Sequence, residues 1–196
     1  MGRRCMLLLG WFWATTLWAQ PNKVIVLANP SFEGRPHDAV TPDQWQACGL
    51  DSSPDILPGP WGVYQKPTNG VTFLGLITRE NNSWEALGQK LPKPFRADRC
   101  YKFSIDLALS PAYAGYSKPT RFRIWGGKNP CQREELLGTS PAIDHYEWKT
   151  YEFIFSPKAE YSYLIIECYY NTPTLEYYRG NLLLDNITTF EPCDRA

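Results

Sequence analysis

The sequence predicts an all-β protein folded as a two-sheet antiparallel β-sandwich, and three observations support this. Short apolar runs with a period of two recur along the chain, as expected for half-buried strands. The 17 prolines and the 15% aromatic content are typical of strands separated by irregular connections. No heptad pattern and no long stretch with a 3.6-residue period interrupts them. Strands of this kind bury one face each by packing as two sheets.

The clearest strand is residues 101–109, where apolar side chains occupy every odd position and Lys102, Ser104 and Asp106 lie between them. Pro-rich or polar segments at 34–44 and 52–69 are expected to be loops. Further strands are expected at 24–27, 45–48, 71–77, 84–91, 121–127, 148–155, 163–169 and 182–190, and 134–138 is ambiguous. The chain therefore has about eight or nine strands.

Residues 1–19 have the pattern of a signal peptide. Arg3 and Arg4 precede a short apolar run at 6–14, and Ala19 is the expected cleavage position. An uncleaved anchor is the alternative. We expect residues 20–196 to form a single β-sandwich domain. No later apolar run approaches about 20 residues, so no transmembrane segment is expected after cleavage. The predicted location is secreted, periplasmic or on the cell surface.

Charge and cysteine usage narrow the function. Acidic and basic residues balance at 20 each with no basic stripe, which argues against a nucleic-acid partner. The cysteines after the signal are Cys48, Cys100, Cys131, Cys168 and Cys193. An odd number leaves at least one free or paired between chains. The absence of a CxxC pair argues against zinc. Cys100 opens one strand and Cys193 follows the last, so they can be bridged if those strands are antiparallel neighbours, but the connectivity stays open.

Several short motifs follow one another over nearly the whole mature chain. They are Asn29-Pro30-Ser31-Phe32-Glu33, Trp45, Asn69-Gly70, Trp84-Glu85, Tyr101-Lys102-Phe103-Ser104, Trp148 and Leu184-Asp185-Asn186-Ile187. Their order resembles the β-jelly-roll carbohydrate-binding modules of the galactose-binding-like superfamily, and is similar to small secreted domains of Bacteroidetes-type bacteria. The resemblance implies a jelly roll in which the first and last strands are neighbours. It also implies a module that binds rather than catalyses.

The resemblance further implies a metal site at Glu33 and Asp185. In this fold an early Glu and a late Asp can share one structural Ca²⁺ that ties the termini of the sandwich together. Calcium prefers several oxygen ligands, including backbone carbonyls, which no sequence reveals. The alternative is a surface Glu and an edge Asp with ordinary hydrogen bonds.

Aromatic residues outside the best strands are the candidates for ligand binding, because flat rings cover the apolar C–H faces of sugars. They are Trp61, Tyr64, Tyr113, Tyr116 and Trp125, with Arg121 or Arg123 as polar partners. Further candidates around the expected last hairpin are Tyr169, Tyr170, Tyr177 and Tyr178. The period of two places Arg121, Arg123 and Trp125 on one strand face. By contrast, we expect a core position for Trp45, Trp84, Phe103, Trp148, Phe153 and Phe155.

The favoured function is a secreted, non-catalytic binding module for a glycan or cell-surface polymer, not an enzyme. One alternative is a surface adhesive or structural protein that binds another surface protein. The other is a small jelly-roll glycoside hydrolase. Its carboxylates would come from Asp38, Asp43, Asp51 and Asp55, whose spacing specifies nothing, or its acid–base site from His145 beside Asp144.

Overall fold

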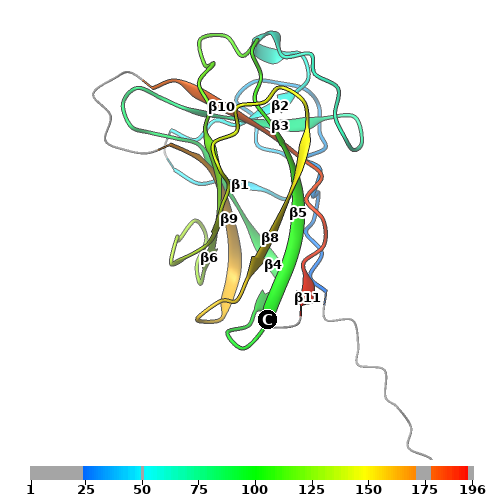
Figure 1. The fold of residues 1–196 in the computed structure, drawn as a ribbon, viewed down its shortest axis with the longest axis vertical. Coiled ribbons are helices and arrows are strands. Elements are labelled where there is room, and N and C mark those ends of the chain that lie inside the picture. Colours follow the sequence, from blue (N-terminus) through cyan, green and yellow to red (C-terminus); the bar gives the residue numbers. More distant parts are fainter. Residues whose placement is uncertain (1–23, 50, 171–177, 194–196) are drawn as a thin grey trace, which may run out of the picture.

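The computed structural model describes residues 24–49, 51–170 and 178–193. Within these residues, eleven β-strands and one short 3-10 helix, η1 (Pro60–Gly62), form two antiparallel sheets (Figure 1). The predicted all-β sandwich is therefore confirmed. The predicted signal peptide at 1–19 lies outside the described residues. No helix in the described part is long and apolar enough to cross a membrane.

The two sheets are named here after a central strand of each. The β9 sheet has the strand order β1 (Gln46–Ala47), β4 (Ala86–Phe95), β9 (Tyr161–Tyr169), β6 (Arg121–Gly127) and β7 (Glu135–Thr139). The β5 sheet has the order β11 (Glu191–Cys193), β5 (Cys100–Ala108), β10 (Gly180–Asp185), β3 (Phe73–Thr78) and β2 (Asp55–Leu57), and β8 (Lys149–Phe155) also pairs with β5.

The core lies between the two sheets and follows from strand alternation. In β5, Tyr101, Phe103, Ile105 and Leu107 are all buried in it, as the odd-position pattern predicts. Aromatic rings contribute strongly to this core, and Phe103, for example, lies 4.6 Å from Phe190 between ring centroids. Each such side chain contributes about 1.5–3 kcal/mol of hydrophobic free energy on burial. This core, rather than local propensity, holds the sheets together.

The first and last described segments are neighbours, as the resemblance implied. Ile25 and Phe190 exchange backbone hydrogen bonds of 3.0 and 2.8 Å. Two disulfides are present among the described cysteines, Cys48–Cys131 and Cys100–Cys193. The second joins β5 to β11, so the suggested bridge is confirmed. Cys168 is free and buried.

Some predicted boundaries are wrong, for physical reasons. Residues 52–69 are not all loop, because Asp55–Leu57 pairs with β3 and forms β2. Ile56 also exchanges two backbone hydrogen bonds of 3.0 Å with His37. The expected strand at 182–190 splits after Asp185, since Asn186 adopts a positive φ of 54° that ends β10. The chain then re-enters the sheet as β11. The segment at 24–27 forms one bridge rather than a strand.

Candidate functional site

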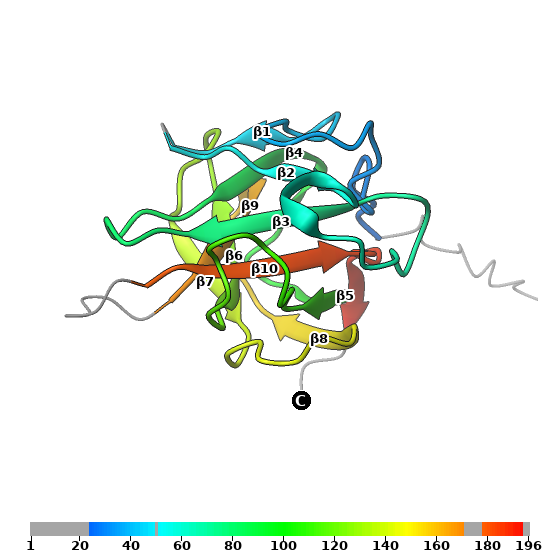
Figure 2. The same ribbon diagram turned by 90° about the horizontal axis from the view of Figure 1, so that it is seen from above.

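The outer face of the β5 sheet is partly covered by its own loops. η1 and the loop after β5 lie against β3 and β10 (Figure 2). They complete a second apolar cluster made of Leu57, Val63, Phe73, Ile77, Ala108, Tyr113 and Leu183. That part of the sheet cannot present side chains to a ligand. The outer face of the β9 sheet has a different composition.

On the β9 sheet, outward positions of β6 and β9 lie side by side. Arg121 is opposite Tyr169, Arg123 is opposite Glu167, and Trp125 is opposite Ile165. Both arginines and Trp125 are half-buried, whereas Phe122 and Ile124 between them are fully buried in the core. The prediction that Arg121, Arg123 and Trp125 share one strand face is confirmed.

A buried carboxylate organises this face. Glu167 is only 1% exposed. Its Oε2 accepts a hydrogen bond from Trp84 Nε1 at 2.9 Å, and its Oε1 accepts one from Trp125 Nε1 at 2.8 Å. Arg133 forms an ion pair with it, with Nε 2.7 Å from Oε2. Arg123 Nη1 lies 3.7 Å from Oε1. The Glu167 cluster is defined as Trp84, Arg123, Trp125, Arg133, Glu167 and Tyr169.

Ring contacts hold the remaining members of the cluster. The Arg123 guanidinium carbon lies 3.2 Å from the centroid of the Tyr169 ring, a cation–π contact. Trp84 packs edge-to-face on Tyr169, with centroids 5.2 Å apart. Arg123 Nε is buried and has no hydrogen-bond partner among the described residues. Two aromatic rings are thus fixed on an accessible sheet face, beside cationic groups.

The Cys48–Cys131 disulfide holds the loop 128–134 over one end of this face. A Cβ at Gly127 would lie 2.1 Å from the Gln132 carbonyl oxygen, and one at Gly88 would lie 2.9 Å from Cys48 Sγ. The loop and the disulfide therefore approach the sheet closely, and Trp125 packs partly beneath them. The loop also delivers Arg133 to Glu167. The open part of the face is toward Trp84 and Tyr169.

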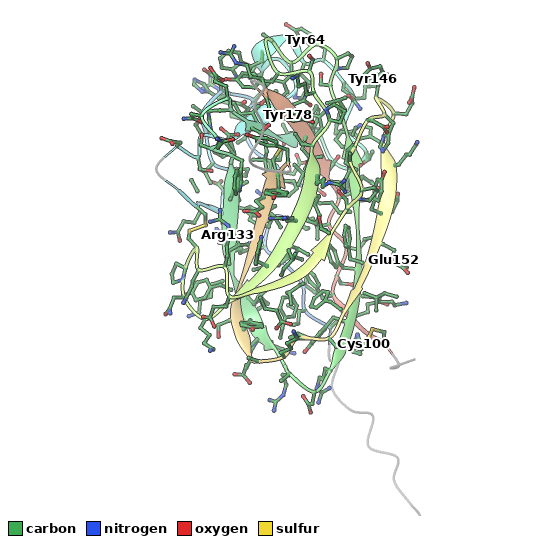
Figure 3. The ribbon with its side chains drawn as sticks, turned by 60° about the vertical axis from the view of Figure 1, so that its left-hand side comes forward. Tyr64, Cys100, Arg133, Tyr146, Glu152 and Tyr178 are labelled. Atoms are coloured by element: carbon green, nitrogen blue, oxygen red, sulfur yellow. A yellow bond between two sulfur atoms is a disulfide. The ribbon has the colours of Figure 1, made fainter. Side chains whose placement is uncertain are left out.

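Two hollows border the open part. The Trp84 hollow, about 230 Å³, is lined by Cys48, Gly49, Asp51, Ser52, Asn82, Ser83, Trp84 and Arg133. The Tyr178 hollow, about 240 Å³, is lined by Pro119, Thr120, Arg121, Ala142, Tyr169, Tyr170 and Tyr178. Figure 3 labels one residue of each, Arg133 and Tyr178. Trp84 and Tyr169, which touch each other, connect the two hollows.

The predicted ligand residues do not form one surface. Tyr113 is 2% exposed and donates its hydroxyl to Asp55, so its ring packs in the second apolar cluster and is not available to a ligand. Tyr116 is partly buried against the same cluster. Trp61 and Tyr64 are 46% and 77% exposed, on the loop that follows β2. Tyr64 and Tyr146 lie at the upper end of the molecule in Figure 3. The loops of the β5 sheet carry these residues, whereas Arg121, Arg123 and Trp125 lie on β6.

Some residues of the site were not predicted. Trp84 was expected in the core, but it lies just before β4 with its indole N–H directed to Glu167 on the outer face. Glu167 was not singled out, although a lone acidic residue in the apolar run 163–169 is the signal that could have revealed it. Of the more distant candidates, Tyr169, Tyr170 and Tyr178 border the site, and Tyr177 lies outside the described residues.

Glu33 and Asp185 act on the same loop. Asp185 Oδ2 accepts hydrogen bonds from the Thr68 and Asn69 backbone N–H groups at 2.7 and 3.0 Å. The Glu33 carboxylate accepts bonds from the backbone N–H groups of Val71 and Thr72. Burial raises the pKa of Asp185. Asp185, at the end of β10, therefore holds the first half of the loop 68–72, and Glu33 holds the second half.

This donor set fits a calcium site only in part. Calcium takes 6–8 oxygen ligands. Among the described residues, no three His, Cys, Asp or Glu side chains gather to hold a metal, so most ligands would come from the backbone. The oxygens of both carboxylates already accept N–H and O–H groups from the loop. Hydrogen bonding alone can thus hold the loop.

Comparisons with known proteins show the fold. No protein-family model matches this chain, and no curated protein matches it. The chain is similar to the CBM22-1 xylan-binding domain of Xyn10C from Paenibacillus barcinonensis, with a TM-score of 0.53 and 15% identity over 91% of this chain and 100% of that one. It is also similar to the K3 cleaved adhesin domain of Lys-gingipain from Porphyromonas gingivalis, with a TM-score of 0.53 and 12% identity over 86% and 98%.

A third similar structure contains two modules. The CBM22-1–GH10 modules of the Clostridium thermocellum xylanase 10B, complexed with xylohexaose, match with a TM-score of 0.51 and 14% identity over 79% of this chain and 27% of that one. Identities this low show a shared fold and no more. The fold is a jelly-roll β-sandwich like that of carbohydrate-binding modules, as the order of the motifs implied.

Proposed function

We propose that this chain is a secreted, non-catalytic module that binds glycans on the outer face of its β9 sheet. The observation that carries the proposal is the buried Glu167 carboxylate, which holds two indole N–H groups and two guanidinium groups on one accessible face. An anion buried this deeply is costly unless its partners satisfy it. Here those partners are the flat and polar groups that sugar recognition requires.

The fold supports this proposal. One similar structure is named as a xylan-binding domain and another contains bound xylohexaose. On this chain, a sugar ring would lie against Trp84 or Tyr169, with hydroxyl groups directed to Arg133 and Asn82 at the Trp84 hollow. Two disulfides are typical of proteins exported to an oxidising compartment, which supports secretion.

The test is a binding survey with matched aromatic variants. The mature protein is titrated by affinity electrophoresis and calorimetry against xylan, mixed-linkage β-glucan and other soluble polysaccharides. Trp84→Ala and Tyr169→Ala should each weaken binding at least about tenfold, the loss expected for an anchoring aromatic residue. Tyr64→Ala removes an exposed ring from the loop that follows β2 and should leave binding unchanged. Equal losses in all three variants, or no binding to any polysaccharide, contradict the proposal.

A second candidate function is adhesion to another surface protein. It is favoured by the exposed rings at the loop end, where Trp61, Tyr64 and Tyr146 are 46%, 77% and 53% exposed. The fold is also that of a cleaved adhesin domain. The Tyr64→Ala variant separates the two candidates, because adhesion through the loop end requires Tyr64 and glycan binding through the Glu167 cluster does not.

We further propose a structural Ca²⁺ between Glu33 and Asp185. The proposal is supported by the two carboxylates acting on one loop and by the pairing of the terminal segments beside them, where Ile187 N–H donates to the Pro30 carbonyl at 3.1 Å. A cation there would add its ligand bonds to that pairing and stabilise the native state by mass action.

A further inference from the structure

Arginine side chains outnumber carboxylates on the open face of the β9 sheet. Glu167 is the one acidic residue among the outward positions described for β6 and β9, whereas β6 carries Arg121 and Arg123 and the loop 128–134 adds Arg133. These four side chains carry a net charge of +2. Glu167 is buried and already bonded to Arg133 and two indoles. Its charge is therefore neutralised inside the cluster and does not reach a ligand.

Of these three arginines, Arg121 is the one with no ion pair to a described carboxylate. Its Nη1 donates to the Ser140 carbonyl at 3.1 Å. That bond fixes one edge of the guanidinium group at the wall of the Tyr178 hollow. A guanidinium group offers five N–H donors in a planar fork, so most of them stay available. The natural partner of such a fork is a planar carboxylate, bound through two parallel hydrogen bonds.

The Tyr178 hollow suits one acidic sugar unit. Tyrosine rings form much of its lining, and the described lining residues include no carboxylate. The Tyr170 and Tyr178 rings stack with centroids 4.4 Å apart, and the Tyr170 hydroxyl donates to Asn82 at 2.6 Å, so the walls are held in place. The volume of the Tyr178 hollow is about 240 Å³. Sites for drug-sized ligands are larger, at about 300–1,000 Å³. The hollow matches a monosaccharide better than a longer segment.

The second hollow differs in charge. Asp51 lines the Trp84 hollow together with Arg133, so positive charge there is offset. A ligand that spans both hollows through Trp84 and Tyr169 would place its neutral sugars at the Trp84 hollow and its anionic group beside Arg121. The two hollows are thus not equivalent subsites.

We propose that the glycan bound by this face is acidic, and that Arg121 binds the carboxylate of a uronic acid unit seated in the Tyr178 hollow. This inference rests on the proposed glycan-binding function and assigns its ligand class. A uronate carboxylate is planar and accepts both hydrogen bonds of the arginine fork.

The test uses the mature protein and a matched pair of ligands. Polygalacturonate is compared with the same polymer after its carboxyl groups are reduced to alcohols, alongside neutral xylan and a sulfated glycan. The uronate polymer should bind at least about tenfold more tightly than its reduced form, the difference expected for a charge-assisted hydrogen-bonded pair. Its affinity should fall as NaCl is raised, since salt screens the pair. This comparison needs no variant and is independent of folding effects.

Variants then test whether the preference for uronate depends on Arg121. Arg121→Gln should abolish the preference for uronate, so that the native and the reduced polymer bind alike. Arg121→Lys, which keeps the charge without the planar fork, should recover only part of the preference. Arg96→Gln makes the same charge change at an exposed position paired with Asp98 and should alter nothing. Melting curves confirm that each variant is folded.

The outcomes separate this inference from the proposed function. Equal binding of native and reduced polymer, or equal effects of Arg121→Gln and Arg96→Gln, would overturn the acidic-ligand assignment while leaving glycan binding in place. Tighter binding of the sulfated glycan than of the uronate would overturn the carboxylate assignment. No binding to any polysaccharide would overturn the proposed function itself.

Discussion

Glu167 shows how one side chain can define a surface. A carboxylate buried on a sheet face would be destabilising alone, because burial removes its hydration. Two indoles and two arginines replace the lost water, and in doing so they lose their own freedom of rotation. A ligand that meets these rings therefore spends little free energy on ordering them. The electrostatic cost of burial and the rigidity of the site have the same origin.

Replacing Glu167 by Gln should destabilise the protein strongly. The amide keeps one acceptor but places N–H donors against donors, and breaking one partner of a buried ion pair costs about 3–5 kcal/mol. Denaturant unfolding measures the loss. The matched control is Glu191→Gln, which breaks an exposed 3.7 Å pair with Lys102 and should change the free energy of unfolding by less than about 1 kcal/mol. Similar losses in both variants would contradict the structural role of Glu167.

A second buried acid, Glu85, makes stability depend on pH. Its carboxylate meets Arg79 at 2.6 Å and the Ile77 N–H at 3.0 Å, yet burial raises its pKa to about 7 from an ordinary 4.5. Between pH 4.5 and 7 the folded protein keeps a proton that the unfolded chain has lost. The Glu85 contribution is therefore fully present below pH 4.5, declines as pH rises to 7, and is constant above.

The free energy of unfolding should accordingly fall by up to about 3 kcal/mol between pH 4.5 and 7 on account of Glu85. Urea titrations across this range measure it. The pKa values of Asp55 and Asp185 are also raised by burial, so the informative quantity is the difference between wild type and Glu85→Gln. A pH profile that is unchanged in the variant would refute the assignment.

At the scale of elements, the sequence predicts what depends on local alternation. β5 and β6 were expected at nearly their observed bounds because one face of each is apolar at every second residue. β2 and β11 were missed because each is only three residues long and forms through pairing with a distant segment. The strand β9 was predicted, but not that Glu167 within it meets Trp84, since that contact depends on the register of β4 against β9.

The loop 68–72 belongs to this scale, because Glu33 and Asp185 connect it to two distant elements. If the proposed Ca²⁺ is bound there, a chelator should lower the melting temperature of the mature protein and added Ca²⁺ should restore it. Glu33→Ala should abolish this calcium-dependent shift. It should also lower the calcium-free melting temperature, because the Val71 and Thr72 N–H groups lose their acceptor.

The control for Glu33→Ala is Glu152→Ala, which removes an exposed acid and should keep the full calcium response. Asn29 is not a suitable control position, because its side chain closes the turn that carries Glu33. A melting temperature that chelator and Ca²⁺ leave unchanged would show that hydrogen bonds alone hold the loop, and would end the calcium proposal.

In the whole molecule, one disulfide stabilises the sandwich and the other positions a loop at the proposed binding face. Cys100–Cys193 joins β5 to β11, while Cys48–Cys131 fixes the loop that delivers Arg133 to Glu167. Replacing both members of the first pair by Ala should cost about 2–5 kcal/mol of stability and leave glycan affinity intact. Replacing both members of the second should lower stability and glycan affinity together. Calorimetry and titration of both double variants would test this, and equal affinity losses would refute the distinction.

The two bridges also make the described chain a covalently interlocked object. The chain segment closed by Cys48–Cys131 overlaps the segment closed by Cys100–Cys193, so every peptide bond between Cys48 and Cys193 lies inside at least one disulfide-closed loop. A protease that cuts once anywhere between Cys48 and Cys193 leaves two pieces that cannot separate without a reducing agent. Such nicks would be invisible on a non-reducing gel and plain on a reducing one. A protein exposed to extracellular proteases could thus be cleaved in a loop and remain a single particle.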